Sequence, residues 1–127
     1  MLETASSEQD KRYTKSHMAY DLKLAERIRA EVKGLPIIEK KMFGGVGYML
    51  HGNMACGILE DNLIVRVALN NYEKTLKRKH VKIFTMKNGP RPMKGWVMVE
   101  PEGYKTSKQL KGWVKTGVDF AINLPPK

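Results

Sequence analysis

Apolar residues recur at the spacing of an α-helix near both ends of the chain. The first run repeats every four residues and predicts a helix over residues 20–33; its members are Tyr20, Leu24, Ile28 and Val32. The second run forms one stripe, made of Leu110, Trp113, Val114, Gly117, Val118, Ala121 and Leu124. Thr106 and Gln109 have the spacing of a capping box, so this stripe predicts a helix over residues 106–124. Gly117 on the apolar side of that helix indicates close packing on a sheet.

Short apolar runs lie between the two helices and are separated by turn residues. Turns are predicted near residues 44–45, 52–53 and 61–62, where glycine, asparagine and aspartate tolerate the backbone of tight hairpins. The segment 38–68 is therefore predicted to be a four-stranded antiparallel meander. Alternation in its last strand places three residues on the buried side, which are Leu63, Val65 and Val67. A later strand is predicted over residues 95–100.

The segments after the meander are less regular. Asn70 and Glu73 have the spacing of a helix cap, which predicts a short helix over residues 71–79. Residues 81–84 form either a strand or a turn that places Phe84 in the core. Residues 87–92 are predicted to be a loop, because Asn-Gly and two prolines interrupt any strand.

Gly47 and Gly57 lie inside predicted strands. Glycine weakens a strand and usually marks a bulge, a bend or the close approach of another backbone. A helix that crosses the sheet at these glycines is the simplest explanation. Together the elements predict an α+β fold, in which a mainly antiparallel sheet (the four-strand meander plus a later strand or strands) is flanked by N- and C-terminal helices.

Length and composition are those of one globular domain. The chain has 127 residues, of which 42% are hydrophobic and 28% charged, and no apolar run reaches the roughly 20 residues of a membrane span. Residues 1–17 are polar, so we expect a flexible leader followed by a single domain over residues 18–127. Cys56 is the only cysteine, which excludes an internal disulfide. With no secretory signal, we expect a cytoplasmic location.

The net charge of +10 is concentrated in one segment. Residues 74–94 contain eight lysines and arginines and no acidic residue. Such a segment is either a solvated surface or a set of phosphate contacts, and no motif of a known nucleic-acid-binding fold decides between them. The candidate phosphate or partner contacts are Lys77, Arg78, Lys79, Lys82, Lys87, Arg91 and Lys94.

No group of residues has the spacing of a catalytic or metal site. His17, His51 and His80 are far apart in the sequence and lack the spacing of metal ligands. Cys56 lies between small residues in mid-strand and is expected to be a buried thiol. Residues 44–47 are glycine-rich, but no helix start and no Lys-Ser/Thr pair follows, as a phosphate loop requires. We therefore expect no catalytic residue, metal or cofactor.

Large aromatic and sulfur-containing side chains accompany the sheet. Trp96 and Trp113 are expected in the core, although tryptophans can also stack on bases. Six methionines border the sheet and either fill an irregular core or form an adaptable partner surface; they are Met42, Met49, Met54, Met86, Met93 and Met98.

The segment 41–57 contains Met-Phe-Gly-Gly-Val-Gly and a later Gly-Asn-Met, and it is followed by Asp-Asn-Leu-Ile-Val-Arg-Val at 61–67. These motifs resemble the N-terminal domain of the TfoX/Sxy family of competence regulators, and the likeness continues through 93–99 and the helix around Trp113. The resemblance implies a mainly antiparallel sheet flanked by helices, similar to the type III secretion-chaperone-like architecture. The family's regulators are transcriptional coactivators for DNA-uptake genes and usually carry a second, C-terminal helical domain. Because this sequence ends at Lys127, we expect the N-terminal domain to stand alone here.

The resemblance and the missing catalytic motifs predict a non-enzymatic regulatory or adaptor domain that acts through protein–protein contacts. The alternative is a basic nucleic-acid-binding module that uses the lysines and arginines of residues 74–94. A small-molecule enzyme is the least favoured hypothesis. A protein partner is expected and no membrane association, and a homodimer is left open.

Overall fold

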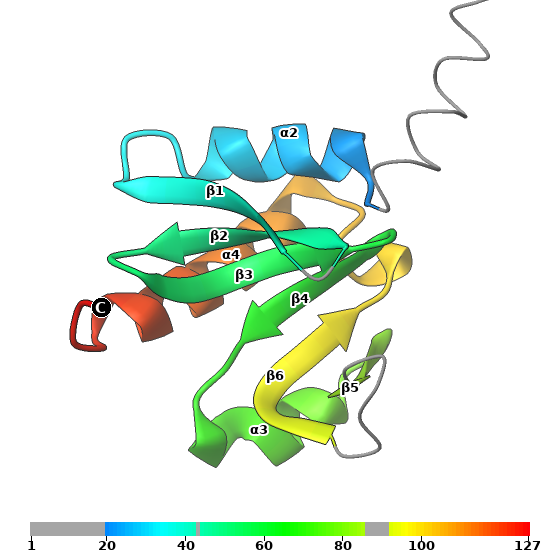
Figure 1. The fold of residues 1–127 in the computed structure, drawn as a ribbon. Helices are drawn as coiled ribbons and strands as arrows, with labels where there is room; N and C mark the ends of the chain where they lie inside the picture. The colour runs from blue at the N-terminus through cyan, green and yellow to red at the C-terminus, as the bar shows by residue number, and fades with distance from the viewer. Residues whose placement is uncertain (1–19, 43, 86–91) are drawn as a thin grey trace, which may run out of the picture.

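The computed structural model describes residues 20–42, 44–85 and 92–127, in which helices pack beside one antiparallel sheet (Figure 1). The elements in chain order are α2 (Leu22–Glu31), β1 (Ile37–Met42), β2 (Gly45–Leu50), β3 (Asn53–Leu59), β4 (Asn62–Arg66), α3 (Leu69–Leu76), β5 (Val81–Thr85), β6 (Pro92–Val99), the 3-10 helix η1 (Pro101–Gly103) and α4 (Ser107–Ile122). The sheet has the strand order β1-β2-β3-β4-β6-β5, and every neighbouring pair is antiparallel. The predicted α+β fold with flanking terminal helices is confirmed. The expected leader, residues 1–17, lies outside the described residues.

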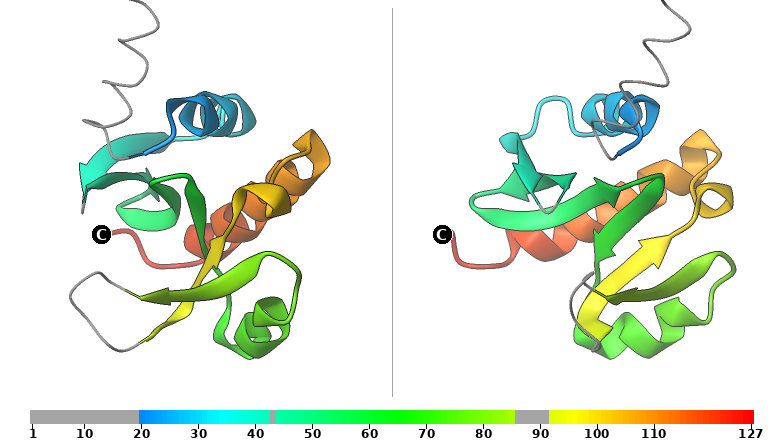
Figure 2. Two further views of the ribbon diagram at one scale, coloured as in Figure 1. Left: turned by 90° about the vertical axis from the view of Figure 1, so that its right-hand side faces the viewer. Right: turned by 45° about the vertical axis from the view of Figure 1, so that its right-hand side comes forward.

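The hydrophobic core lies between the sheet and the helices. α4 packs against β3 and β4 and also contacts α2, and Figures 1 and 2 together show α2, α3 and α4 on the same side of the sheet. Leu63, Val65 and Val67 are buried in this core, as their alternation predicts. Trp113 is only 3% exposed, and its indole N–H donates a hydrogen bond to the carbonyl oxygen of Gly103 at 3.0 Å.

Two of the three helix starts follow from local sequence. The Asp21 carboxylate accepts hydrogen bonds from the first backbone N–H groups of α2. The predicted capping box of α4 is confirmed, because Thr106 Oγ1 accepts from the Gln109 N–H at 3.1 Å and Gln109 Oε1 from the Thr106 N–H at 2.8 Å. The predicted cap of α3 is wrong. α3 begins at Leu69, after Ala68, which provides no side-chain cap.

Tertiary contacts explain where the later elements differ from the predictions. Val67 N–H donates to the carbonyl oxygen of Gly95 at 2.8 Å, so the chain is held to β6 until just before α3 begins. Residues 81–85 form a strand, and Phe84 is buried in it. Strand β6 starts at Pro92, three residues earlier than predicted. Residues 87–91 of the predicted loop lie outside the described residues.

Gly117 allows α4 to approach the sheet closely, as the sequence predicts. A Cβ atom added there would collide with the backbone carbonyl of Ala55 in β3. Gly112, in the same helix, has no such neighbour within 4 Å. The two glycines therefore have opposite roles, since one permits packing and the other only lowers helix propensity.

We predict opposite effects of one substitution at these two glycines. Gly117→Ala should lower the free energy of unfolding by about 1–3 kcal/mol, because the added methyl group forces α4 away from β3. Gly112→Ala should raise it by about 1 kcal/mol through helix propensity alone. Urea denaturation of both variants measures this. Equal effects at the two sites would contradict the close approach at Gly117.

Trp113 provides a second test of the core. Trp113→Ala should lower the free energy of unfolding by about 3–5 kcal/mol, because it removes a fully packed indole and its hydrogen bond to Gly103. The midpoint of chemical denaturation measures the change. A loss below about 1 kcal/mol would mean that the indole is not packed in the core.

Candidate functional site

The sheet face opposite the described helices, called the open face here, carries one continuous row of paired residues. Residues directly opposite each other in antiparallel strands point to the same side of the sheet. The pairing register connects one residue from each strand in this cross-sheet row, which runs Lys40, Gly47, Gly57, Ile64, Met98, Lys82. The row has apolar residues and glycines in the middle and a lysine on each edge strand.

Methionine side chains cover the two glycines of this row. A Cβ atom added to Gly47 would lie 3.2 Å from the sulfur of Met54 and 3.3 Å from the sulfur of Met42. A Cβ atom on Gly57 would lie 2.5 Å from Cε of Met54. The prediction that a helix crosses the sheet at these glycines is therefore wrong. The helix approaches on the other face at Gly117, and the strand glycines leave room for methionines.

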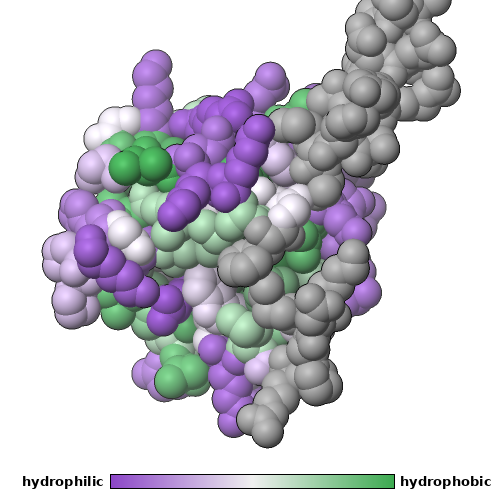
Figure 3. Space-filling view, in the orientation of Figure 1, coloured by the Kyte–Doolittle hydropathy of each residue, from purple (hydrophilic) through white to green (hydrophobic). Residues whose placement is uncertain are grey.

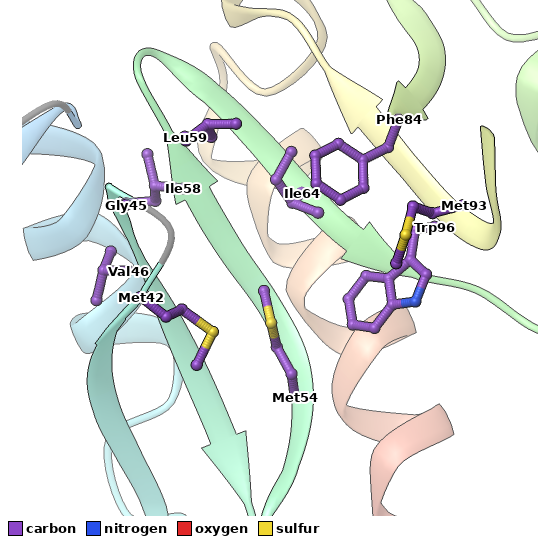
Figure 4. Close-up of a pocket in the computed structure, with 10 residues that line it drawn as sticks. All are labelled: Met42, Gly45, Val46, Met54, Ile58, Leu59, Ile64, Phe84, Met93 and Trp96. Carbon is purple, nitrogen blue, oxygen red and sulfur yellow. The ribbon is translucent and has the colours of Figure 1, made fainter. Parts of the chain in front are cut away.

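A groove of about 300 Å³ lies on the open face above these residues. Figure 4 shows Met42 and Met54 on one side of it and Phe84, Met93 and Trp96 on the other. Every described residue of the lining is apolar or glycine; the set is Met42, Gly45, Val46, Met54, Ile58, Leu59, Ile64, Phe84, Met93 and Trp96. Figure 3 shows hydrophobic side chains across the middle of this face, next to hydrophilic ones.

The described methionines of the sheet are outside the core. None of Met42, Met49, Met54, Met93 and Met98 belongs to the buried core cluster, and the pairing register places Met49 and Met98 on the open face as well. The structure therefore excludes the predicted core arrangement for these five methionines, and the partner surface stays a prediction. Met86 lies outside the described residues.

The prediction that Trp96 lies in the core is also wrong. The tryptophan is half-buried at the groove and not in the core between the sheet and the helices. The Arg66 guanidinium lies 5.0 Å from the centroid of the Trp96 ring and 4.9 Å from that of Phe120. These distances are typical of cation–π contacts, which fix the tryptophan at the end of the groove.

Cys56 is a buried thiol, as predicted. It has no exposed surface, and burial raises its pKa to about 12. A thiol that stays protonated at neutral pH is a poor nucleophile. Among residues 20–42, 44–85 and 92–127, no three His, Cys, Asp or Glu residues are grouped so that they could hold a metal ion.

The predicted basic contacts are distributed over several elements. Lys77, Arg78 and Lys79 are exposed in the turn after α3, but the Arg78 guanidinium lies over Trp113, 4.1 Å from the ring centroid. Lys82 in β5 forms an ion pair with Glu100 at 2.7 Å. Lys94 is exposed in β6. The remaining two candidates, Lys87 and Arg91, lie outside the described residues.

Comparison with known proteins identifies the family of the chain. No helix within the described part of the chain is long and apolar enough to cross a membrane. No curated protein matches the sequence. The family model described as the TfoX N-terminal domain matches residues 33–121, which is more than half of the chain and includes every residue that lines the groove. The chain belongs to the TfoX N-terminal domain family.

Proposed function

We propose that this chain is a non-enzymatic regulatory or adaptor domain that binds another protein through the groove on its open face. The family indicates a competence-related regulatory domain. The observation that carries the proposal is the apolar groove itself, because an apolar depression on a sheet face with no described helix over it is typical of a binding surface. A cytoplasmic location is part of the proposal.

The chemistry of the groove supports binding over catalysis. Small-molecule active sites combine apolar walls with a few placed polar groups that orient the substrate and move protons. The described residues of the lining are methionine, glycine, aliphatic and aromatic residues. Methionine is flexible and polarizable, so a surface rich in it adapts to the shape of a protein partner.

Photo-crosslinking tests this proposal at two matched positions. p-Benzoylphenylalanine at Met42, which lines the groove, should yield discrete protein adducts in cells of the organism that encodes the chain. The same residue at Lys111, which is exposed on α4 away from the groove, should yield none of these adducts. Mass spectrometry of the adducts identifies the partner. Identical adducts at both positions, or none at Met42, would contradict a partner site on the open face.

Nucleic-acid binding is the second candidate function. It is supported by the exposed lysines at the end of α3, Lys74, Lys77 and Lys79. Arg78 and Lys82 support it less, because both are already engaged, with Trp113 and Glu100 respectively. A variant that tests this candidate should therefore leave Arg78 in place, since its removal would also expose the Trp113 ring.

Salt dependence separates the two candidates. If the α3 lysines contact phosphates, fluorescence anisotropy with a random DNA duplex should show binding that weakens steeply with salt, with a slope of about −0.9 per contact. Lys77→Glu combined with Lys79→Glu should abolish it, and Lys108→Glu combined with Lys111→Glu on α4 is the matched control. Absence of binding at low salt would leave these lysines as a solvated surface.

A further inference from the structure

We propose that the groove binds an amphipathic α-helix of a partner protein, with apolar side chains in the groove and acidic residues near both ends of the helix. This inference rests on the proposed function and specifies the chemistry of the partner. Four observations carry it, namely the size of the groove, the hydrogen bonding of the strands below it, and the positions of the positive and the negative charges around it.

The size of the groove suits side chains of a larger partner. Its volume of about 300 Å³ is at the lower end of the range for small-molecule sites, roughly 300–1,000 Å³. Among the described residues that line it, none has a charged, hydroxyl or amide side chain that could orient a small ligand. One or two large apolar side chains from one face of a helix would fill it, as in other helix-in-groove complexes.

The backbone below the groove favours a helix over an extended strand. Most lining residues of the groove come from β2, β3, β4 and β6, and each of these strands pairs with a neighbour on both sides. Among the described lining residues, only Met42 and Phe84 come from the edge strands β1 and β5. The ladder N–H and C=O groups of the inner strands are therefore already used within the sheet, and a strand laid on this face would find no backbone partners. A helix satisfies its own backbone hydrogen bonds and needs only side-chain contacts.

The positive charges lie at the two ends of the cross-sheet row. Lys40 on β1 and Lys82 on β5 are separated by five inter-strand spacings of about 4.8 Å each, or about 24 Å in total. A helix of about 16 residues spans this length. Lys82 already contacts Glu100, but both side chains are partly exposed. Such pairs contribute little, so a carboxylate of the partner can replace Glu100.

The negative charges define the orientation of the helix. Glu60 and Asp61 are exposed in the turn between β3 and β4, next to the groove residue Leu59. A helix with acidic ends that lay along β3 would approach this turn and be repelled. A helix across the strands, along the cross-sheet row, avoids these acids and reaches the two lysines.

The same charges disfavour a second copy of this chain as the occupant. Each copy has a net charge of +10, and a face-to-face dimer would bring the lysines of one row close to those of the other. Like charges placed across an interface destabilise it. An acidic partner has the complementary charge and would also associate faster.

The test measures the binding of designed peptides to the full chain by fluorescence anisotropy. The probe is a capped helical peptide of about 16 residues, with leucine and phenylalanine at i, i+3, i+4 and i+7 and glutamates near both ends. A second peptide has lysine at every glutamate position, and a third has alanine at the apolar positions. We expect saturable binding of the first peptide and binding at least about tenfold weaker of the other two.

Matched variants locate the site. Met54→Gln removes an apolar contact inside the groove and should weaken binding by about tenfold, whereas Met49→Gln, on the same face but outside the lining, should not. Lys40→Glu should weaken binding at one end of the row, and Lys111→Glu on α4 should not. Circular dichroism confirms that each variant is folded, and the Lys40→Glu result decides the test if Met54→Gln unfolds.

Three outcomes would overturn the inference. They are equal binding of the glutamate and lysine peptides, equal effects of Met54→Gln and Met49→Gln, and a dimer in light scattering that Met54→Gln dissociates, which would assign the groove to a second copy. Adducts of Met42 with a different protein, together with either of the first two outcomes, would leave the proposed function intact and reject only the acidic helix. The dimer would reject both. Absent adducts would reject the proposed function, whatever the peptides do.

Discussion

The packing of all described helices on one face of the sheet is the constraint on which the rest of the structure depends. α4 can lie close to β3 only because Gly117 has no side chain to meet the Ala55 carbonyl. Once the core is closed on that side, the opposite face of β2, β3 and β4 must be covered by its own side chains. Met42 and Met54 do this by lying over Gly47 and Gly57. The space that these two glycines leave therefore holds two of the methionines that line the groove.

Local sequence was sufficient to predict most helices and strands, and which residues of β4 face the core. The capping box of α4, the meander and the inward positions of β4 depend on residues close together in the chain, and all were predicted. The start of α3 was not, because it depends on the hydrogen bond between Val67 and Gly95, which are distant in sequence. Arg66 alternates with Val65 and Val67 and lies on the other face of β4.

The groove could not be predicted, because period-two alternation shows which residues share a face but not which face the helices occupy. In β6, Trp96 and Met98 alternate with Val97 and Val99, so both faces are apolar and the pattern gives no preference. The deciding signal was Arg66, which pairs directly with Trp96. That signal becomes available only once β4 and β6 are known to be neighbours, and their pairing skips α3 and β5.

An apolar groove on a free protein invites self-association, and the charge of this chain opposes it. A net charge of +10 disfavours the approach of two copies, and in our proposal the groove binds a partner of opposite charge. In that proposal the methionines would tolerate variation in the partner's side chains, since a flexible thioether repacks at little cost. Selectivity would then reside in the charges at the ends of the row, which act on association rate and orientation more than on affinity.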